Sequence, residues 1–417
     1  MGGRNTIRIM TAERCAMSNP YVKSLKSFDP KKDLLVNEKF RVEGGQSQPD
    51  TLSDLEAEEG EAGLSGDAGT EYCSFKTGGP ILGGIRLIPD TTNRTILLAG
   101  NKNGEVYLLT PEGSALKPIL KFKIPGSIIR TPAYADGIIY CTTRQGLVIA
   151  VNTGLKDAAD NTKTIQPEVI WQENLPKGIL TEPIATGKIL IIASLDGLRA
   201  YEAYYESAAA KAIGKSLWVM PIDGTVSTPL LHSGVIYIGS EDKQLNAFEY
   251  GGSSISPVWR YKANAAIRAK PTVSKRGNYI LASSIDGSVY CLPGTGEKLR
   301  WVFIARAPVY SSIVSEVVDN EEFFYFGADN GIFYCLNTFG KEVWRFKTNG
   351  KIRTEPLIHE NGIFFGCEDN HLYCLNSKTG KPNFTFGTDG NINGSPIIVD
   401  NILYFGSTDS FIHGIHL

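Results

Sequence analysis

The sequence predicts an all-β fold: an eight-bladed β-propeller of four-stranded antiparallel blades over residues 71–417. The first observation is a repeat, because Trp171, Trp218, Trp259, Trp301 and Trp344 are separated by 47, 41, 42 and 43 residues. The second is that short runs of Ile, Val, Tyr and Phe alternate with Gly, Asp and Asn, which is typical of strands and turns. The third is a recurring tight turn between two such runs, the strongest short signal for a hairpin.

Residues 1–70 differ from the rest of the chain. Between Asp54 and Glu71 the acidic residues accumulate without any Lys or Arg, among Gly and Ser. We therefore expect residues 1–70 to form a flexible, acidic, largely disordered tail. Residues 21–43 contain scattered apolar side chains, which are compatible either with a short docking motif or with more of the tail.

Each copy of the repeat has the same order of parts. A Trp begins an extended segment that leads to a Pro, as from Trp171 to Pro183 and from Trp344 to Pro356. A strand, a turn, a second strand, a tight turn and a third strand follow. The tight turns are Asn103-Gly104, Gln145-Gly146, Asp196-Gly197, Asp286-Gly287 and Asn330-Gly331, with Asp242-Lys243, Asp369-Asn370 and Asp409-Ser410 as variants. A lone blade cannot bury both faces, but a closed ring of blades can.

Three further copies bring the number of blades to eight, with Phe384, Leu120 and Cys73 in the Trp position. The last copy ends with its third strand, Phe411–Leu417, and lacks an outermost strand. An outermost strand without inner strands before it occurs at residues 71–77. We therefore expect residues 71–77 to complete the last blade, which would close the ring and remove an open sheet edge.

The cysteine-rich stretch from Phe364 to Asn376 raises the question of a metal site. It repeats the register of Tyr325–Asn337, so its cysteines belong to a strand of the repeat, where Cys is a small apolar filler. Strand alternation does not obviously bring His371 together with Cys367 or Cys374. We therefore expect no metal site, and reduced, buried thiols for the seven cysteines, none of which forms a C-x-x-C pair.

Charge and hydropathy restrict the partners. Lys plus Arg number 42 and Asp plus Glu number 44, giving a net charge of −2, so we expect neither nucleic acid nor an anionic membrane surface as a partner. No run of 18 apolar residues is present, so we expect no membrane span. The first residues lack the apolar core of a signal peptide and a lipobox, which favours a cytoplasmic protein. We also expect a monomer.

The third and fourth strands resemble a known family. The segments CLNSKTGKPNFTF (Cys374 to Phe386), CLNTFGKEVWRF (Cys335 to Phe346) and CLPGTGEKLRWVF (Cys291 to Phe303) resemble the PQQ-like, or quinoprotein-type, propeller repeat. The resemblance covers residues 71–417. Dehydrogenases of this family use adjacent cysteines and a calcium site, and this chain has neither adjacent cysteines nor a C-x-x-C-H haem motif. The resemblance to cofactor-free, BamB-like scaffold members implies no cofactor, and one or more proteins as partners.

The leading functional hypothesis is a non-enzymatic protein-protein interaction scaffold, because no catalytic or phosphate-binding motif occurs and the five histidines are scattered. The alternative is a quinone- or small-ligand-binding propeller, either a sensor or a PQQ-dependent oxidoreductase-like enzyme, that uses the central funnel. Residues just before the innermost strands should surround the mouth of this funnel, although they are equally compatible with ordinary solvated loops. The predicted site is Arg130, Glu182, Arg268, Lys270, Tyr310, Arg353, Glu355 and Asn393. The long connections 155–168 and 201–216 are further candidate surfaces.

Overall fold

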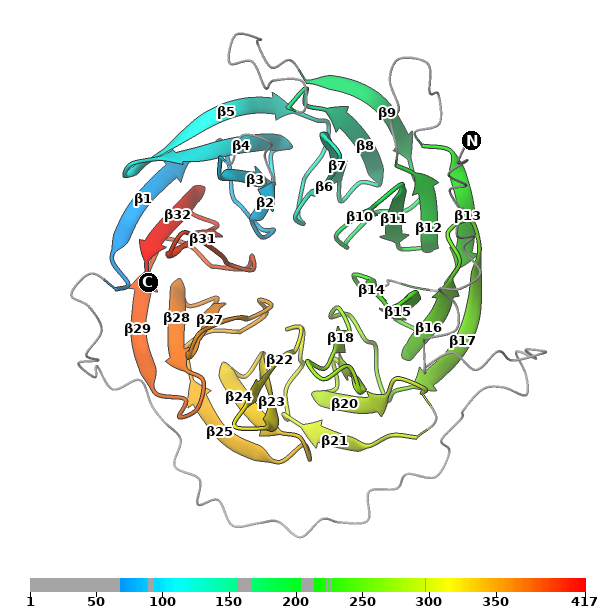
Figure 1. Cartoon of the computed structure of the whole chain (residues 1–417), viewed down its shortest axis with the longest axis vertical. Coiled ribbons are helices and arrows are strands. Elements are labelled where there is room, and N and C mark those ends of the chain that lie inside the picture. Colours follow the sequence, from blue (N-terminus) through cyan, green and yellow to red (C-terminus); the bar gives the residue numbers. More distant parts are fainter. Residues whose placement is uncertain are drawn as a thin grey trace, which may run out of the picture.

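The computed structural model describes residues 68–88, 94–155, 167–203, 214–222, 224, 227–296 and 298–417. Within these ranges, eight four-stranded antiparallel sheets are arranged as blades around a central axis (Figure 1). This confirms the predicted eight-bladed propeller. Residues 1–67 of the expected tail lie outside the described residues, as do residues 156–166 and 204–213 of the two long connections. The described part of the chain contains no helix long and apolar enough to cross a membrane.

In seven blades the strands follow chain order from the axis to the rim. The first four of these blades are β2 (Arg86–Ile88), β3 (Ile96–Gly100), β4 (Glu105–Glu112) and β5 (Ala115–Lys123); β6 (Ala133–Ala135), β7 (Ile138–Thr142), β8 (Leu147–Asn152) and β9 (Glu168–Asn174); β10 (Ile184–Thr186), β11 (Ile189–Ser194), β12 (Gly197–Glu202) and β13 (Ser216–Pro221); and β14 (Leu230–His232), β15 (Val235–Gly239), β16 (Gln244–Tyr250) and β17 (Ile255–Lys262).

The next three blades have the same order. They are β18 (Thr272–Val273), β19 (Tyr279–Ser283), β20 (Ser288–Pro293) and β21 (Trp301–Ile304); β22 (Val314–Val318), β23 (Glu321–Gly327), β24 (Ile332–Asn337) and β25 (Glu342–Lys347); and β26 (Leu357–His359), β27 (Gly362–Gly366), β28 (His371–Asn376) and β29 (Pro382–Gly387). Their second and third strands are almost wholly buried, so the core lies between successive blades.

The last blade joins both ends of the described chain. It contains β30 (Ile397–Val399), β31 (Ile402–Gly406) and β32 (Phe411–His416), and its outermost strand is β1 (Glu71–Lys76). β1 pairs antiparallel with β32, with Phe75 opposite Ile412. The pairing extends to the preceding residues, since the Gly69 N–H donates to the His416 carbonyl at 2.9 Å. The predicted closure by residues 71–77 is confirmed.

The tight turns explain why Gly recurs between the second and third strands. At this position the backbone is left-handed, with φ of 80° at Gly104 and 73° at Gly331. Where Gly is missing, the same conformation is held by Lys243, Asn370 and Ser410, with φ of 72°, 72° and 76°. A left-handed backbone is unfavourable for most side chains, which explains why Gly, the residue least penalised there, predominates.

All five tryptophans lie on outermost strands, as predicted. Each of them packs toward a loop between the third and fourth strands of the next blade. The Trp344 Nε1–H, for example, donates to the Ser377 carbonyl at 3.1 Å. The ring also lies against Gly380, where a Cβ would be only 2.6 Å from it and φ is +70°. The tryptophans therefore join neighbouring blades at the rim.

The six described cysteines are free and buried, in agreement with the packing role predicted for them. Burial raises the pKa of the Cys73 thiol to about 11 and that of Cys374 to about 12. Such thiols stay protonated and unreactive at neutral pH. In the ranges that the structure covers, no group of three or more His, Cys, Asp and Glu is placed to hold a metal ion.

Candidate functional site

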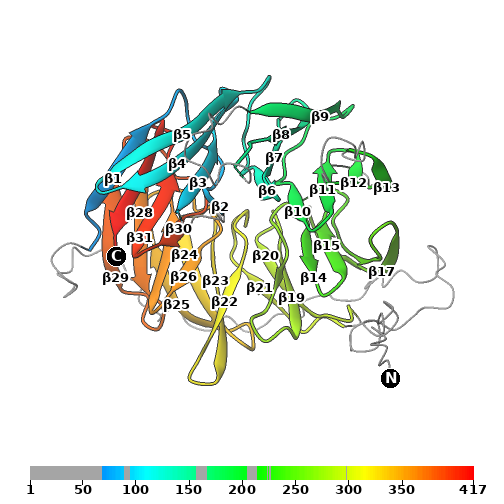
Figure 2. The same ribbon diagram turned by 45° about the horizontal axis from the view of Figure 1, so that its top comes forward.

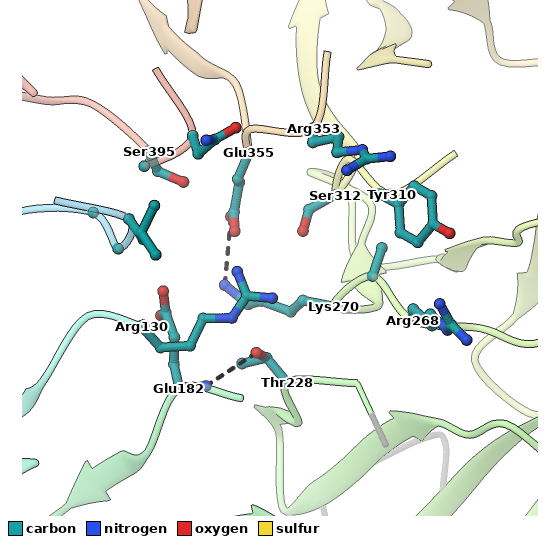
Figure 3. Close-up of a pocket in the computed structure, with 16 residues that line it drawn as sticks. Arg130, Glu182, Thr228, Arg268, Lys270, Tyr310, Ser312, Arg353, Glu355 and Ser395 are labelled. Atoms are coloured by element: carbon teal, nitrogen blue, oxygen red, sulfur yellow. Dashed lines mark hydrogen bonds and ion pairs between the residues drawn. The ribbon is translucent and has the colours of Figure 1, made fainter. Parts of the chain in front are cut away.

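The candidate site lies on the axis of the ring, where the segments that precede the innermost strands converge. Lys270 stands two residues before β18, and Glu355 stands two residues before β26. The structure brings all eight predicted residues around one pocket (Figure 3). They are joined there by residues that the sequence had not singled out, namely Leu82, Gly83, Gly84, Thr228, Ala269, Ser312, Gly394 and Ser395. Protein binding by the eight predicted residues stays a prediction.

Charged side chains from opposite parts of the ring fill the centre of the channel. The Lys270 Nζ lies 3.4 Å from Glu355 Oε1, which links two blades that are not adjacent. Arg130 reaches toward the axis (Figure 3), and its Nε–H donates to the Leu180 carbonyl at 2.8 Å. The surrounding protein lowers the pKa of the Arg130 guanidinium by desolvation, although water in the channel still reaches the side chain.

Glu182, one of the two carboxylates in the channel, is held in place by two threonines. Its carboxylate accepts a hydrogen bond from the Thr131 hydroxyl at 2.8 Å, and its backbone N–H donates to Thr228 Oγ1 at 3.2 Å. The space left among the side chains is about 80 Å³. A cavity of this size holds a handful of water molecules.

At the mouth of the channel, Tyr310 lies beside two arginines. The guanidinium carbon of Arg353 is 4.7 Å from the centre of the Tyr310 ring, and that of Arg268 is 6.0 Å from it. Arg353 is held by Asp329, to which it donates two hydrogen bonds of 2.8 and 2.6 Å. These bonds raise the pKa of Arg353, so the group is a permanent cation.

Arg268 is fixed in a similar way from the neighbouring turn. It pairs with Glu241, and this hydrogen bond raises the pKa of its guanidinium. A further bond of 3.3 Å joins Arg353 to Glu368. Sequence reasoning missed these carboxylate partners, although Glu241, Asp329 and Glu368 lie at or beside the tight turns of the repeat. In an antiparallel blade, those turns and the segments before the innermost strands lie on the same face.

The comparisons with known proteins agree with this architecture. Residues 286–417 match the family model described as "Outer membrane protein assembly factor BamB". The C-terminal part of the propeller is therefore similar to the PQQ-like, BamB-like family, as predicted from the sequence. No curated protein matches the sequence.

Solved structures similar to this PQQ-like propeller share its fold at low identity. BamB from Moraxella catarrhalis is 18% identical with a TM-score of 0.62, covering 84% of this chain and 97% of that one. Chaetomium thermophilum Sqt1, bound to the N-terminus of the ribosomal protein L10, is 10% identical with a TM-score of 0.65, covering 77% and 93%. A europium-containing methanol dehydrogenase is 13% identical with a TM-score of 0.58, covering 81% and 85%. At these identities the likeness shows the fold alone.

The channel of this PQQ-like propeller does not fit a quinone cofactor. Pockets that hold molecules of this kind have volumes on the order of 300–1,000 Å³, whereas the space on the axis is about 80 Å³. Lys270 and Glu355 also bridge this space.

Proposed function

We propose that this PQQ-like propeller is a non-enzymatic scaffold that binds another protein at the channel mouth. The observation that carries the proposal is the cluster of Tyr310 with Arg268 and Arg353, whose guanidinium groups are both held by carboxylates. Tyr and Arg are the residue types that dominate binding energy at protein interfaces. Side chains that are already fixed lose little conformational entropy on binding, which favours affinity.

The charged channel supports a polypeptide rather than a small cofactor as the ligand. Four cationic side chains and two carboxylates line the pocket: Arg130, Arg268, Lys270, Arg353, Glu182 and Glu355. Such a surface offers hydrogen bonds to the backbone and the charged side chains of a partner. Sqt1, which has a similar fold, is bound to a protein N-terminus in its own structure, and this supports the same kind of ligand here.

A matched pair of tyrosines tests the proposal. Tyr279 is also half-buried, and its ring lies 4.7 Å from Arg300, but it starts β19 at the opposite end of the inner strands. Proteins captured from a cell lysate by the full chain would be compared with those captured by Tyr310→Ser and Tyr279→Ser. We expect the partner to be lost at least about tenfold with Tyr310→Ser, since hot-spot residues contribute about 2 kcal/mol or more, and to be retained with Tyr279→Ser.

Retention of every captured protein by Tyr310→Ser would contradict binding at the channel mouth. The quinone alternative is tested separately, by the absorption spectrum and the melting temperature with added pyrroloquinoline quinone and calcium. We expect neither to change. A stabilisation that saturates with the quinone would favour the ligand-binding alternative.

A further inference from the structure

Among the hairpins formed by the first and second strands of each blade, the one made by β22 and β23 has the longest strands in the described residues, and its turn lies away from the channel mouth. β22 and β23 contain five and seven residues, whereas β26 and β27 in the next blade contain three and five. The hairpin projects beyond its neighbours at the lower edge of Figure 2, in yellow. Its turn, Asp319-Asn320, lies at the end of β22 remote from the channel-lining Ser312. The projection therefore belongs to the opposite face of the ring.

Both neighbouring blades hold the tip of this hairpin. Arg276 of the preceding blade donates to the Asn320 carbonyl and, at 3.0 Å, to the Asn320 side-chain oxygen. Lys378 of the following blade lies 3.2 Å from Asp319 Oδ2. The two Arg276 bonds therefore hold the tip of the extended hairpin, which forms a wall, and the exposed Lys378 ion pair adds little.

A cleft of about 390 Å³ lies between this wall and the following blade. Val318, Phe323, Tyr325, Cys335 and Val343 make its lining largely apolar. The Tyr325 ring in the lining is held in place, because the single proton of its hydroxyl is shared between Glu316 Oε1 at 2.9 Å and the Ser377 carbonyl at 3.3 Å. The volume is within the range of sites that take a compact ligand or side chains of a partner, about 300–1,000 Å³.

The cleft also contains a polar group without a partner. Ser377 is 2% exposed, and its side-chain oxygen makes no hydrogen bond within the described part of the chain. Its backbone carbonyl, by contrast, accepts bonds from Trp344 and Tyr325. Buried hydroxyl groups are normally satisfied, so the hydroxyl of Ser377, a residue of the cleft lining, would gain a hydrogen bond from a group that reaches it.

The mouth of the cleft carries an excess of negative charge. Asp319 and Glu321 face a single cation, Lys378. The Asp319 side chain is 86% exposed, and its ion pair with Lys378 is therefore weak and replaceable. Glu321 is exposed, and the described residues provide no ion pair for its carboxylate.

We propose that this cleft binds a peptide segment of a partner protein in which an apolar side chain is flanked by Lys or Arg. The apolar side chain would bury itself against Val318, Phe323 and Val343, and the Ser377 hydroxyl would bond to the peptide backbone. The flanking cations would pair with Asp319 and Glu321. This second interaction surface is independent of the channel mouth, so either can fail without the other.

Valine-methyl NMR of the full chain tests the binding, with acetylated Gly-Lys-Phe-Lys-Gly as the probe. We expect the methyl signals of Val318 and Val343 to shift on titration. Peptides with Ala in place of Phe, or Glu in place of Lys, should bind at least about tenfold more weakly. Unshifted signals at both valines, or equal binding of the Ala peptide, would overturn the proposal. So would a small aromatic amine such as benzylamine that shifts the two signals when no peptide does.

Two variants with a matched control assign the binding to the cleft. Val343 on β25 and Val302 on β21 are both 39% exposed on outermost strands, but only Val343 lines the cleft. Val343→Arg should reduce the affinity for the probe at least tenfold, whereas Val302→Arg should leave it unchanged. Glu321→Lys, at the exposed start of β23, should reverse the preference toward the Glu-flanked peptide. Equal losses in the two valine variants, or an unchanged preference in Glu321→Lys, would contradict the assignment.

Discussion

Removing the closing strand should open the ring, whereas removing the residues before it should not. A chain that lacks residues 1–67 keeps Gly69 and Thr70, which already bond to His416 of β32. A chain that lacks residues 1–78 loses β1 entirely, so that β32 becomes an unpaired edge strand. The comparison therefore isolates the contribution of β1.

The magnitude follows from what β1 contacts. It pairs with β32 from Glu71 to Lys76, and the Thr77 N–H donates to the Ser410 carbonyl at 2.8 Å. Each such bond contributes about 1 kcal/mol net. Cys73 is buried in the seam, and the Phe75 ring packs edge-on against Tyr107 of the first blade at 5.7 Å. Buried apolar side chains add about 1.5–3 kcal/mol each.

The loss is therefore comparable with the whole stability of an ordinary domain, about 5–15 kcal/mol. Circular dichroism should show a lower Tm for the chain without residues 1–78, by roughly 10 °C or more at 2–4 °C per kcal/mol. Size-exclusion chromatography should show its aggregation through the exposed edge. The chain without residues 1–67 should melt like the full chain.

A synthetic peptide of residues 68–80 provides the rescue experiment. If the missing strand causes the loss, the added peptide should raise the Tm of the shorter chain in a concentration-dependent way, since it binds the folded state. Equal melting of the two truncated chains would refute closure by β1 as the source of the stability.

Two further predictions concern the rim and the dependence on pH. Gly234→Ala places a Cβ in open space at φ +78°, whereas Gly380→Ala at φ +70° places it 2.6 Å from the Trp344 ring. Urea unfolding should show a loss of stability of about 1–2 kcal/mol from backbone strain in both variants, and a further loss of about 1–3 kcal/mol in Gly380→Ala. Equal losses in the two variants would show that the tryptophan contact adds nothing. Two Arg199 hydrogen bonds of 2.8 Å lower the pKa of Asp196 to about 2, so their stabilisation is present above the unfolded-state pKa of about 3.9 and is lost as the pH falls toward 2. Thermal melts of Arg199→Leu should therefore lose less stability than the wild type between about pH 4 and 2, and parallel losses would contradict this assignment.

The repeat made the ring predictable, because the tryptophans and the tight turns recur in one register. The pairing of β1 with β32 was also predictable. The last copy of the repeat lacks an outermost strand, and an additional outermost strand precedes the inner strands of the first copy. The positions around the channel followed from the same register. Each of these inferences uses the sequence pattern within a single blade. Because successive side chains of a strand point to opposite faces of the sheet, that pattern also predicts the face on which each side chain lies.

The features that the sequence did not predict depend on contacts between blades. The partners of Arg353 and Arg268 lie in turns of their own and adjacent blades, and nothing in the pattern specifies which carboxylate reaches which guanidinium. The cleft has a weak signal in the sequence, because the interval from Ile313 to Asn330 is longer than the matching interval from Pro356 to Asp369. The ion pair between Lys378 and Asp319 has no such signal, since it joins residues 59 positions apart.

Closure by the first and last strands also has a consequence for biosynthesis. The Thr77 hydroxyl and its partner in the closing blade, the Ser410 carbonyl, are 333 positions apart in the chain. β1 leaves the ribosome early and must wait, unpaired, until β32 has been made. Contacts of such long sequence separation form slowly, and the waiting strands are open to wrong pairing. The seven other blades can form as the chain emerges, but the ring itself is completed only after translation has passed β32.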